Sequence, residues 1–198
     1  MAHLHRIVHG VSRVGAIVGG AMLMLAAIVI CVDVTMRYAF ARTLGGADEL
    51  SGYALAIASA WGFSSALLSR SHIRIDTVYV RVGSRARATL DLLSLACFVL
   101  FIALVAWHGW GVLQQSWVSG SRSMNELETP LVIPQALWVA GLVFFVAVAL
   151  LLLVRALPLY LAGDLRRLFD LIGSKSAVAE AEEEIRAIEH AIEGERKP

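Results

Sequence analysis

The charged residues that could do chemistry stand at the ends of apolar runs. Asp33 and Arg37 lie in the stretch CVDVTMRYAF, which closes an uncharged run that begins at Val14. Four residues apart on one helix, the carboxylate and the guanidinium face the same side and can pair. The pair either neutralises itself at the helix end or meets another element, such as a second helix or the acidic pair Asp48 and Glu49. A catalytic carboxylate is not predicted, because no nucleophile or second base stands at a matching depth.

Other patterns that could hold a metal or a cofactor are weak. His3, His5 and His9 could bind a metal, but no acid or thiol stands near them in the sequence. His108 is the only histidine inside an apolar run, and a haem held between two histidines would need a second one at similar depth. The sequence has no Gly-rich phosphate loop, Ser-His-Asp arrangement or zinc motif. We therefore expect no cofactor, no metal and no enzymatic activity, and the net charge of +1 predicts no nucleic-acid partner.

The composition predicts a membrane protein. Of 198 residues, 58% are hydrophobic and only 17% are charged, which is a small charged share for a soluble domain. Four runs have no charged side chain for 19 residues or more: Val14–Val32, Leu50–Ser69, Leu92–Ser121 and Thr129–Val154. About 20 helical residues cross a hydrocarbon core of ~30 Å, and a helix satisfies its own backbone in lipid. We predict an all-α integral membrane protein with four transmembrane helices, near residues 14–36, 50–69, 90–113 and 134–157.

The basic residues predict the orientation of these helices. Eleven of them fall on one side of the membrane: Arg6, Arg13, Arg70, Arg74, Arg81, Arg85, Arg87, Arg155, Arg166, Arg167 and Lys175. Only three fall on the other side, namely Arg37, Arg42 and Arg122. Cytoplasmic loops carry the excess of Lys and Arg, so both termini are expected in the cytoplasm.

Small residues predict where the helices pack. The second run, LSGYALAIASAWGFSSALLS, has a small residue at nearly every second position, and the first run carries a Gly-x-x-x-Gly pattern. Such positions let helix backbones approach closely. The predicted contact residues are Gly15, Gly19, Gly52, Ala56 and Ser59. No run carries an acid or a base at its middle, where charges mark ion pathways, which argues against transport by this chain alone.

The chain divides into a tail at 1–13, a membrane domain at 14–157 and a tail at 158–198. In the second tail, DLRRLFDLI predicts an amphipathic helix on the membrane surface. Beyond it, apolar residues at 3-4 spacing among glutamates favour a solvated cytoplasmic helix, with docking onto another chain as the alternative. Between the second and third runs, Asp76 could cap a short interfacial helix; a strand is the alternative there.

Taken together, several pieces resemble a known family. They are DVTMRYAF, ADELSGYALAIASAWGFSSALLSRSHIRID and TPLVIP, spread over residues 14 to 157. In order and spacing, they are similar to the small membrane subunit (DctQ type) of tripartite ATP-independent periplasmic (TRAP) transporters. One departure is Ser71, where a glycine is common in the family.

The resemblance implies a non-enzymatic subunit in a bacterial inner membrane. Its partners would be membrane lipids, a large multi-span subunit and a periplasmic solute-binding protein. It would scaffold the large subunit for sodium-coupled, binding-protein-dependent uptake of an organic acid-type solute. The positions that match the family's polar motif are Asp33, Arg37, Glu49, Arg70, His72 and Asp76.

The loop before the last run leaves two interpretations open. Arg122 stands against Glu126 and Glu128 there, and prolines stiffen the end of the loop. By analogy with the family, these residues could touch the binding protein; otherwise the loop is a solvated hairpin. For the whole chain, the alternatives to a TRAP subunit are a membrane anchor of another complex, such as a respiratory enzyme, and a homo-oligomeric channel.

Overall fold

The computed structural model describes residues 2–69, 82–125 and 127–173, and every named element in them is an α-helix. The helices are α1 (Ala2–Phe40), α2 (Ala47–Leu68), α4 (Ser84–Ser119), α5 (Val132–Leu161) and α6 (Leu165–Ile172). The prediction of an all-α fold is confirmed. The predictions for Asp76 and its interfacial helix, and for the helix after residue 173, lie outside the described residues.

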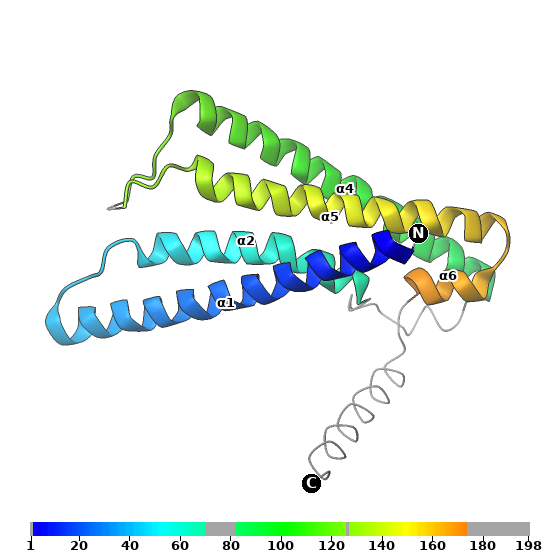
Figure 1. The fold of residues 1–198 in the computed structure, drawn as a ribbon, viewed down its shortest axis with the longest axis horizontal. Helices are drawn as coiled ribbons and strands as arrows, with labels where there is room; N and C mark the ends of the chain where they lie inside the picture. The colour runs from blue at the N-terminus through cyan, green and yellow to red at the C-terminus, as the bar shows by residue number, and fades with distance from the viewer. Residues whose placement is uncertain (1, 70–81, 126, 174–198) are drawn as a thin grey trace, which may run out of the picture.

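The four long helices form an open layer of two hairpins. Helix α1 packs on α2, α2 packs on α5, and α5 packs on α4, so α1 and α4 stand at the two ends of this packing order (Figure 1). The short helix α6 packs against α5 and α4. Because α1 is held chiefly by α2, much of its apolar surface stays exposed, including Ile17, Met24 and Leu25.

The hydrophobic core lies where α2, α4 and α5 meet. Phe145 of α5 is 1% exposed and touches the rings of Phe63 from α2 and Phe98 from α4, with centroids 5.7 and 5.5 Å away. Ala60, Ala88 and Ala149 are fully buried in the same core, so the backbones approach closely. The core therefore joins the two hairpins mainly through α2 and α5.

Three of the described helices are long and apolar enough to cross a membrane. They are α1 from Arg6 to Phe40, α4 and α5. Helix α2, which contains most of the predicted span 50–69, is not among them, because its serines and glycines lower its hydropathy. Transmembrane character is thus supported for three of the four predicted spans.

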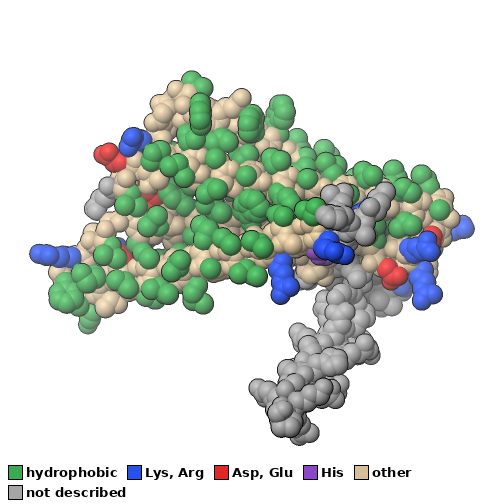
Figure 2. All heavy atoms as spheres, in the orientation of Figure 1, with side chains coloured by type: hydrophobic (Ala, Val, Ile, Leu, Met, Phe, Trp, Pro, Cys, Tyr) green, Lys and Arg blue, Asp and Glu red, His purple; other side chains and the backbone are tan. Residues whose placement is uncertain are grey.

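The helices are longer than the uncharged runs. Helix α1 has 39 residues and α4 has 36, so at ~1.5 Å per residue each exceeds 50 Å, well beyond a hydrocarbon core of ~30 Å. Arginine and serine outside the apolar run are compatible with a helix in water, so the backbone has no reason to stop at the first charge. Charged side chains lie at the left end and over the right half of the molecule, and the stretch between them is largely hydrophobic (Figure 2).

Helix α6 is amphipathic as predicted, but its apolar side meets protein. Asp164 caps its start by accepting a hydrogen bond from the backbone N–H of Arg167 at 3.2 Å. Leu168 is fully buried and Ile172 is 8% exposed, both within the core formed with α4 and α5. The expected membrane-surface helix therefore closes one end of the bundle.

Candidate functional site

The carboxylate of Asp33 binds the end of its own helix and the loop that follows. Its Oδ2 accepts from Arg37 at 2.6 Å, and its Oδ1 accepts from the Thr43 hydroxyl at 2.8 Å and the Leu44 backbone N–H at 2.7 Å. Asp33 is 3% exposed, whereas 60% of the Arg37 side chain is exposed. Since bonds to an ionised acceptor are strong, this carboxylate fixes the α1–α2 loop against α1.

The acidic pair at the start of α2 is divided between solvent and protein. Asp48 is exposed, while Glu49 is 7% exposed. Glu49 Oε1 accepts from the Tyr53 hydroxyl at 2.7 Å, one helical turn away. Both acids lie in the first turn of α2, where the helix dipole favours a negative charge. Among the described residues, the hydrogen bonds of Asp33 go to Arg37, Thr43 and Leu44, and none reaches Asp48 or Glu49.

The carboxyl of Glu49 faces the α4–α5 loop, and its surroundings lower its pKa. The hydrogen bond from Tyr53 is the main cause, and the polar side chains of Ser123, Thr129 and Asn125 lower the pKa further against the opposing effect of burial. These three residues come from the loop between α4 and α5. The carboxylate therefore brings α2 together with a segment about 75 residues away along the chain.

The α4–α5 loop is a small hairpin that rests on the α1–α2 loop. The Ser123 N–H donates to the Thr129 carbonyl at 2.9 Å, and the Arg122 guanidinium donates to the carbonyl of Glu128 at 3.4 Å. Leu127 lies directly over Gly46, where any Cβ would overlap its side chain. Gly46 also has φ +81°, which favours glycine. Arg122 and Glu128 are exposed on this hairpin, and Glu126 lies outside the described residues.

Within the described residues, Gly15 and Gly19 of α1 contact α2, whereas Gly52 contacts no neighbouring helix. A methyl group added at Gly15 would lie 3.1 Å from the Trp61 ring, and one at Gly19 would lie 3.0 Å from the Ala58 Cα. At Gly52 no atom of the described residues lies within 4 Å of an added methyl group, because this residue faces outward.

Ala56 and Ser59, the two remaining predicted contact residues, are partly exposed. Ala56 lines a small cavity of about 100 Å³ against α5, together with Tyr53, Gln135 and Trp138. The Ser59 hydroxyl donates to the Leu55 carbonyl of its own helix at 2.7 Å. Ala56 thus faces the neighbouring helix, and the hydroxyl of Ser59 is satisfied within α2.

Trp61 joins three helices, and the sequence analysis missed it. Its indole N–H donates to the Leu137 carbonyl of α5 at 3.1 Å, and its ring stacks on Phe144 at a centroid distance of 5.7 Å. A methyl group at Gly141 would lie 2.8 Å from the ring, and Gly15 packs on its other side. The available signal was one large aromatic residue among small ones, opposite glycines in two other apolar runs.

Asp91 is a third buried acid, and the sequence analysis missed it. It is 1% exposed in the first turns of α4, directly before the uncharged run Leu92–Ser121 and inside the predicted span 90–113. Its signal was an acid within the apolar pattern of a helix start. Like Asp33 and Glu49, it lies toward a helix end, so the buried charges of the described chain avoid the middle of the helices.

The remaining predicted site residues give no chemical site. Arg70, His72 and Asp76 lie outside the described residues. Within the described ranges, no group of three or more His, Cys, Asp or Glu could hold a metal, and His108 is exposed on α4. Among the described residues, the polar groups of Asp33 and Asp164 hold a loop and a helix end in place.

These features define a class: a helical membrane protein whose buried carboxylates fasten its own loops. The family model for "Tripartite ATP-independent periplasmic transporters, DctQ component" matches residues 15–159, and the chain belongs to this family. No curated protein and no solved structure matches the chain. The family is a transporter component rather than an enzyme family, and the resemblance noted from the motifs is confirmed.

Proposed function

We propose that this chain is the scaffold subunit of a TRAP transporter. It holds a large membrane subunit in place for sodium-coupled, binding-protein-dependent uptake of an organic acid-type solute. The observation that carries the proposal is the open layer α1–α2–α5–α4, in which both end helices keep large apolar surfaces uncovered. A chain of this shape offers long helix faces to a partner and encloses little space between its own helices.

In this proposal all four long helices span the bacterial inner membrane, with both termini in the cytoplasm. The α1–α2 and α4–α5 loops then lie together on the periplasmic side, as their contact through Gly46 and Leu127 supports. Helix α2 spans despite its lower hydropathy, because α1 and α5 cover much of its surface. Its small residues suit contact with protein better than contact with lipid.

Among the described positions of the polar motif, we assign a structural role to Asp33 and Glu49 and contact with a partner to Arg37. Asp33 and Glu49 are nearly enclosed and engaged within the chain. Arg37 keeps most of its side chain exposed while paired, so its other N–H groups can bind a carbonyl or carboxylate of the large subunit. The exposed residues Arg122 and Glu128, with Glu126 between them, are assigned to contact with the solute-binding protein.

Co-purification tests the proposed partnership. The tagged full chain is expressed with its large membrane subunit and extracted in mild detergent, alongside a variant in which α1 carries two bulky apolar side chains, Met24→Trp and Ile28→Trp. Both residues are exposed on α1 (66% and 53%) and both changes keep the helix apolar, so the fold and membrane insertion of the chain itself should survive. We expect stoichiometric recovery of the large subunit with the wild type and loss of it with the variant. A wild-type chain that retains no large subunit would contradict the proposal.

A further inference from the structure

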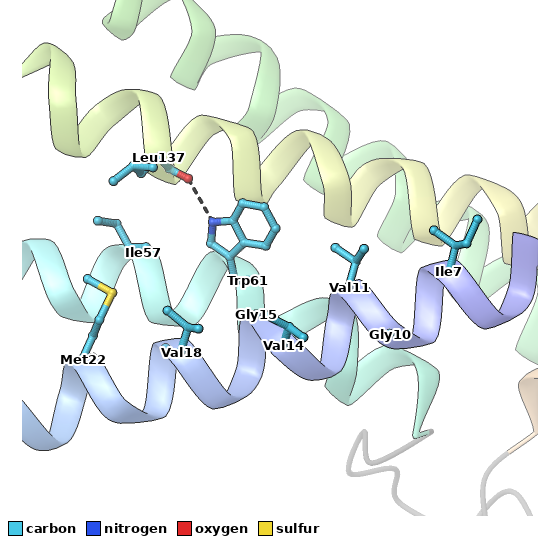
Figure 3. A pocket seen from close by; sticks show the side chains of 11 residues that line it. Ile7, Gly10, Val11, Val14, Gly15, Val18, Met22, Ile57, Trp61 and Leu137 are labelled. Atoms are coloured by element: carbon cyan, nitrogen blue, oxygen red, sulfur yellow. Dashed lines mark hydrogen bonds between the residues drawn. The ribbon is translucent and has the colours of Figure 1, made fainter.

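An apolar groove runs along the first half of α1. It has a volume of about 640 Å³ and lies between α1 and α5, with Trp61 of α2 between them (Figure 3). The α1 side is formed by Ile7, Val11, Val18 and Met22, and Leu137 contributes from α5. Glycines on α1, including Gly10, add no side chain to this wall and so leave the groove open.

Water is a poor occupant of this groove. Its residues are aliphatic or glycine apart from Met22 and Trp61, and the indole N–H of Trp61 already donates to the Leu137 carbonyl at 3.1 Å. Cavities without free polar partners stay dry. Since α1 is apolar enough to span a membrane, an apolar group from the surroundings must fill the space.

The size of the groove fits a chain narrower than a helix. From Ile7 to Met22 it follows α1 for roughly 22 Å, at ~1.5 Å per residue. A helix of that length, ~10 Å wide, would occupy on the order of 2,000 Å³. The groove therefore accommodates one extended hydrocarbon chain, whereas a partner helix could insert only its side chains.

The charge around the groove selects the headgroup. Arg6 and Arg13 are exposed, and each directly precedes a residue that lines the groove, Ile7 and Val14. The sequence has no acidic residue before Asp33. This half of α1 is thus purely basic, which favours an anionic phosphate at the membrane surface.

We propose that the groove binds one acyl chain of an anionic phospholipid, whose phosphate is held by Arg6 and Arg13. The lipid belongs to the leaflet that contains the N-terminal half of α1. It fills the space that α1, Trp61 and α5 leave open along the groove. This lipid site is independent of whether the chain scaffolds a large subunit.

A pair of matched glycine variants separates groove filling from a general change in α1. Gly10 lines the groove and Gly20 does not; both are exposed, and no atom of the described residues lies within 4 Å of a methyl group added at either. Gly10→Leu should therefore fill the groove without disturbing the fold. Gly20→Leu places the same side chain elsewhere on α1 and serves as the control.

Fluorescence quenching reads the occupant directly. The full chain keeps Trp61 alone, with Trp107, Trp110, Trp117 and Trp138 changed to Phe, and is reconstituted in vesicles containing phosphatidylglycerol with a brominated acyl chain. We expect strong quenching in the Trp61 chain and with Gly20→Leu, and loss of most of it with Gly10→Leu. Equal quenching in all three chains would overturn the proposal.

A second measurement uses the chain with its native tryptophans. Phospholipid retained after mild-detergent purification is counted by native mass spectrometry for wild type, Gly10→Leu and Gly20→Leu. We expect one anionic phospholipid to be lost only with Gly10→Leu, and no such loss would overturn the proposal. Arg6→Gln and Arg13→Gln should each lower the preference for phosphatidylglycerol over phosphatidylcholine by about fivefold; an unchanged preference would overturn the headgroup assignment.

The same quenching experiment identifies the competing occupant. When the large membrane subunit is added in excess, a lipid in the groove continues to quench Trp61. Disappearance of quenching on addition would show that a helix of the large subunit displaces the lipid, and the groove would then be a protein contact.

Discussion

At the scale of single residues, Asp33 and Glu49, two of the three buried acids of the described chain, hold local structure in place. Both are nearly enclosed: Asp33 is bonded to the loop after α1, and Glu49 is bonded to Tyr53 of its own helix and faces the α4–α5 loop. Because removing a partner from a buried charge leaves its desolvation cost uncompensated, these residues are sensitive positions for stability. The exposed basic partner Arg37 should matter far less to the fold.

A pair of substitutions at the end of α1 tests this difference. Asp33→Asn weakens the bonds to Thr43 and Leu44 and breaks the ion pair, so the thermal unfolding midpoint in detergent should fall clearly. Arg37→Gln removes only the ion pair with its largely exposed side chain, so its effect should be small. Equal falls for the two variants would show that the loop bonds contribute nothing.

The pH dependence of stability tests the role of Glu49. The Tyr53 hydroxyl and the facing loop residues hold the pKa of this carboxyl below its ordinary value of 4.5. Because the folded-state pKa is the lower one, the stabilisation is complete above about pH 4.5 and is lost as the pH falls through the folded pKa. The midpoint difference between wild type and Glu49→Gln should therefore shrink on acidification. A difference that grows toward low pH would contradict this assignment.

At the scale of elements, the two hairpins are joined where α2 meets α5. Trp61 packs between Gly15 of α1 and Gly141 of α5, and its hydrogen bond to Leu137 fixes its ring. Glycine is required at Gly141 because the ring and Ala60 occupy the space of a side chain. This contact sets the spacing of the two hairpins.

Adding one methyl group to α5 should loosen this joint. Gly141→Ala places a Cβ 2.8 Å from the Trp61 ring, and overpacking of this kind costs roughly 1–3 kcal/mol. Gly111→Ala on α4 meets no described atom within 4 Å, so its higher helix propensity should leave stability unchanged or raise it by less than about 1 kcal/mol. Unfolding in mixed micelles measures both; a harmless Gly141→Ala would contradict the packing.

The α4–α5 hairpin is the element assigned to the solute-binding protein. Reversing its acids, Glu126→Lys with Glu128→Lys, should raise the binding-protein concentration needed for half-maximal uptake. Charges at the rim of an interface affect mainly how the partners associate, so the maximal rate of uptake should change little. Asp170 is exposed on α6, at the opposite end of the molecule, so Asp170→Lys is the control. Unchanged dependence on the binding protein would argue against contact at this hairpin.

Much of the fold was predictable because apolar run length dictates helices in a membrane. The helix contacts at Gly15 and Gly19 followed from small-residue spacing, but Gly52 shows that spacing alone cannot tell which face is turned outward. The approach of Glu49 to the α4–α5 loop was not predictable, since it depends on how two distant loops meet. Asp91 was missed because the charge itself was used to end the run.

At the scale of the whole molecule, the open layer is the basis for the proposal that this chain supports a transporter rather than acting as one. The buried charges of the described residues lie toward helix ends, so the interior between the helices has no chain of ionisable groups for an ion to follow. The uncovered faces of α1 and α4 instead offer apolar surface to a neighbour and to lipid. As a member of the DctQ family, the chain provides one component of an assembly.

Solute uptake by reconstituted mixtures tests the scaffold account most directly. Proteoliposomes contain this chain alone, the large subunit alone, or both, and a sodium gradient and the solute-binding protein are supplied to each. The account predicts uptake only when both subunits are present, with none from this chain alone. Full uptake by the large subunit without this chain, or flux through this chain by itself, would contradict it.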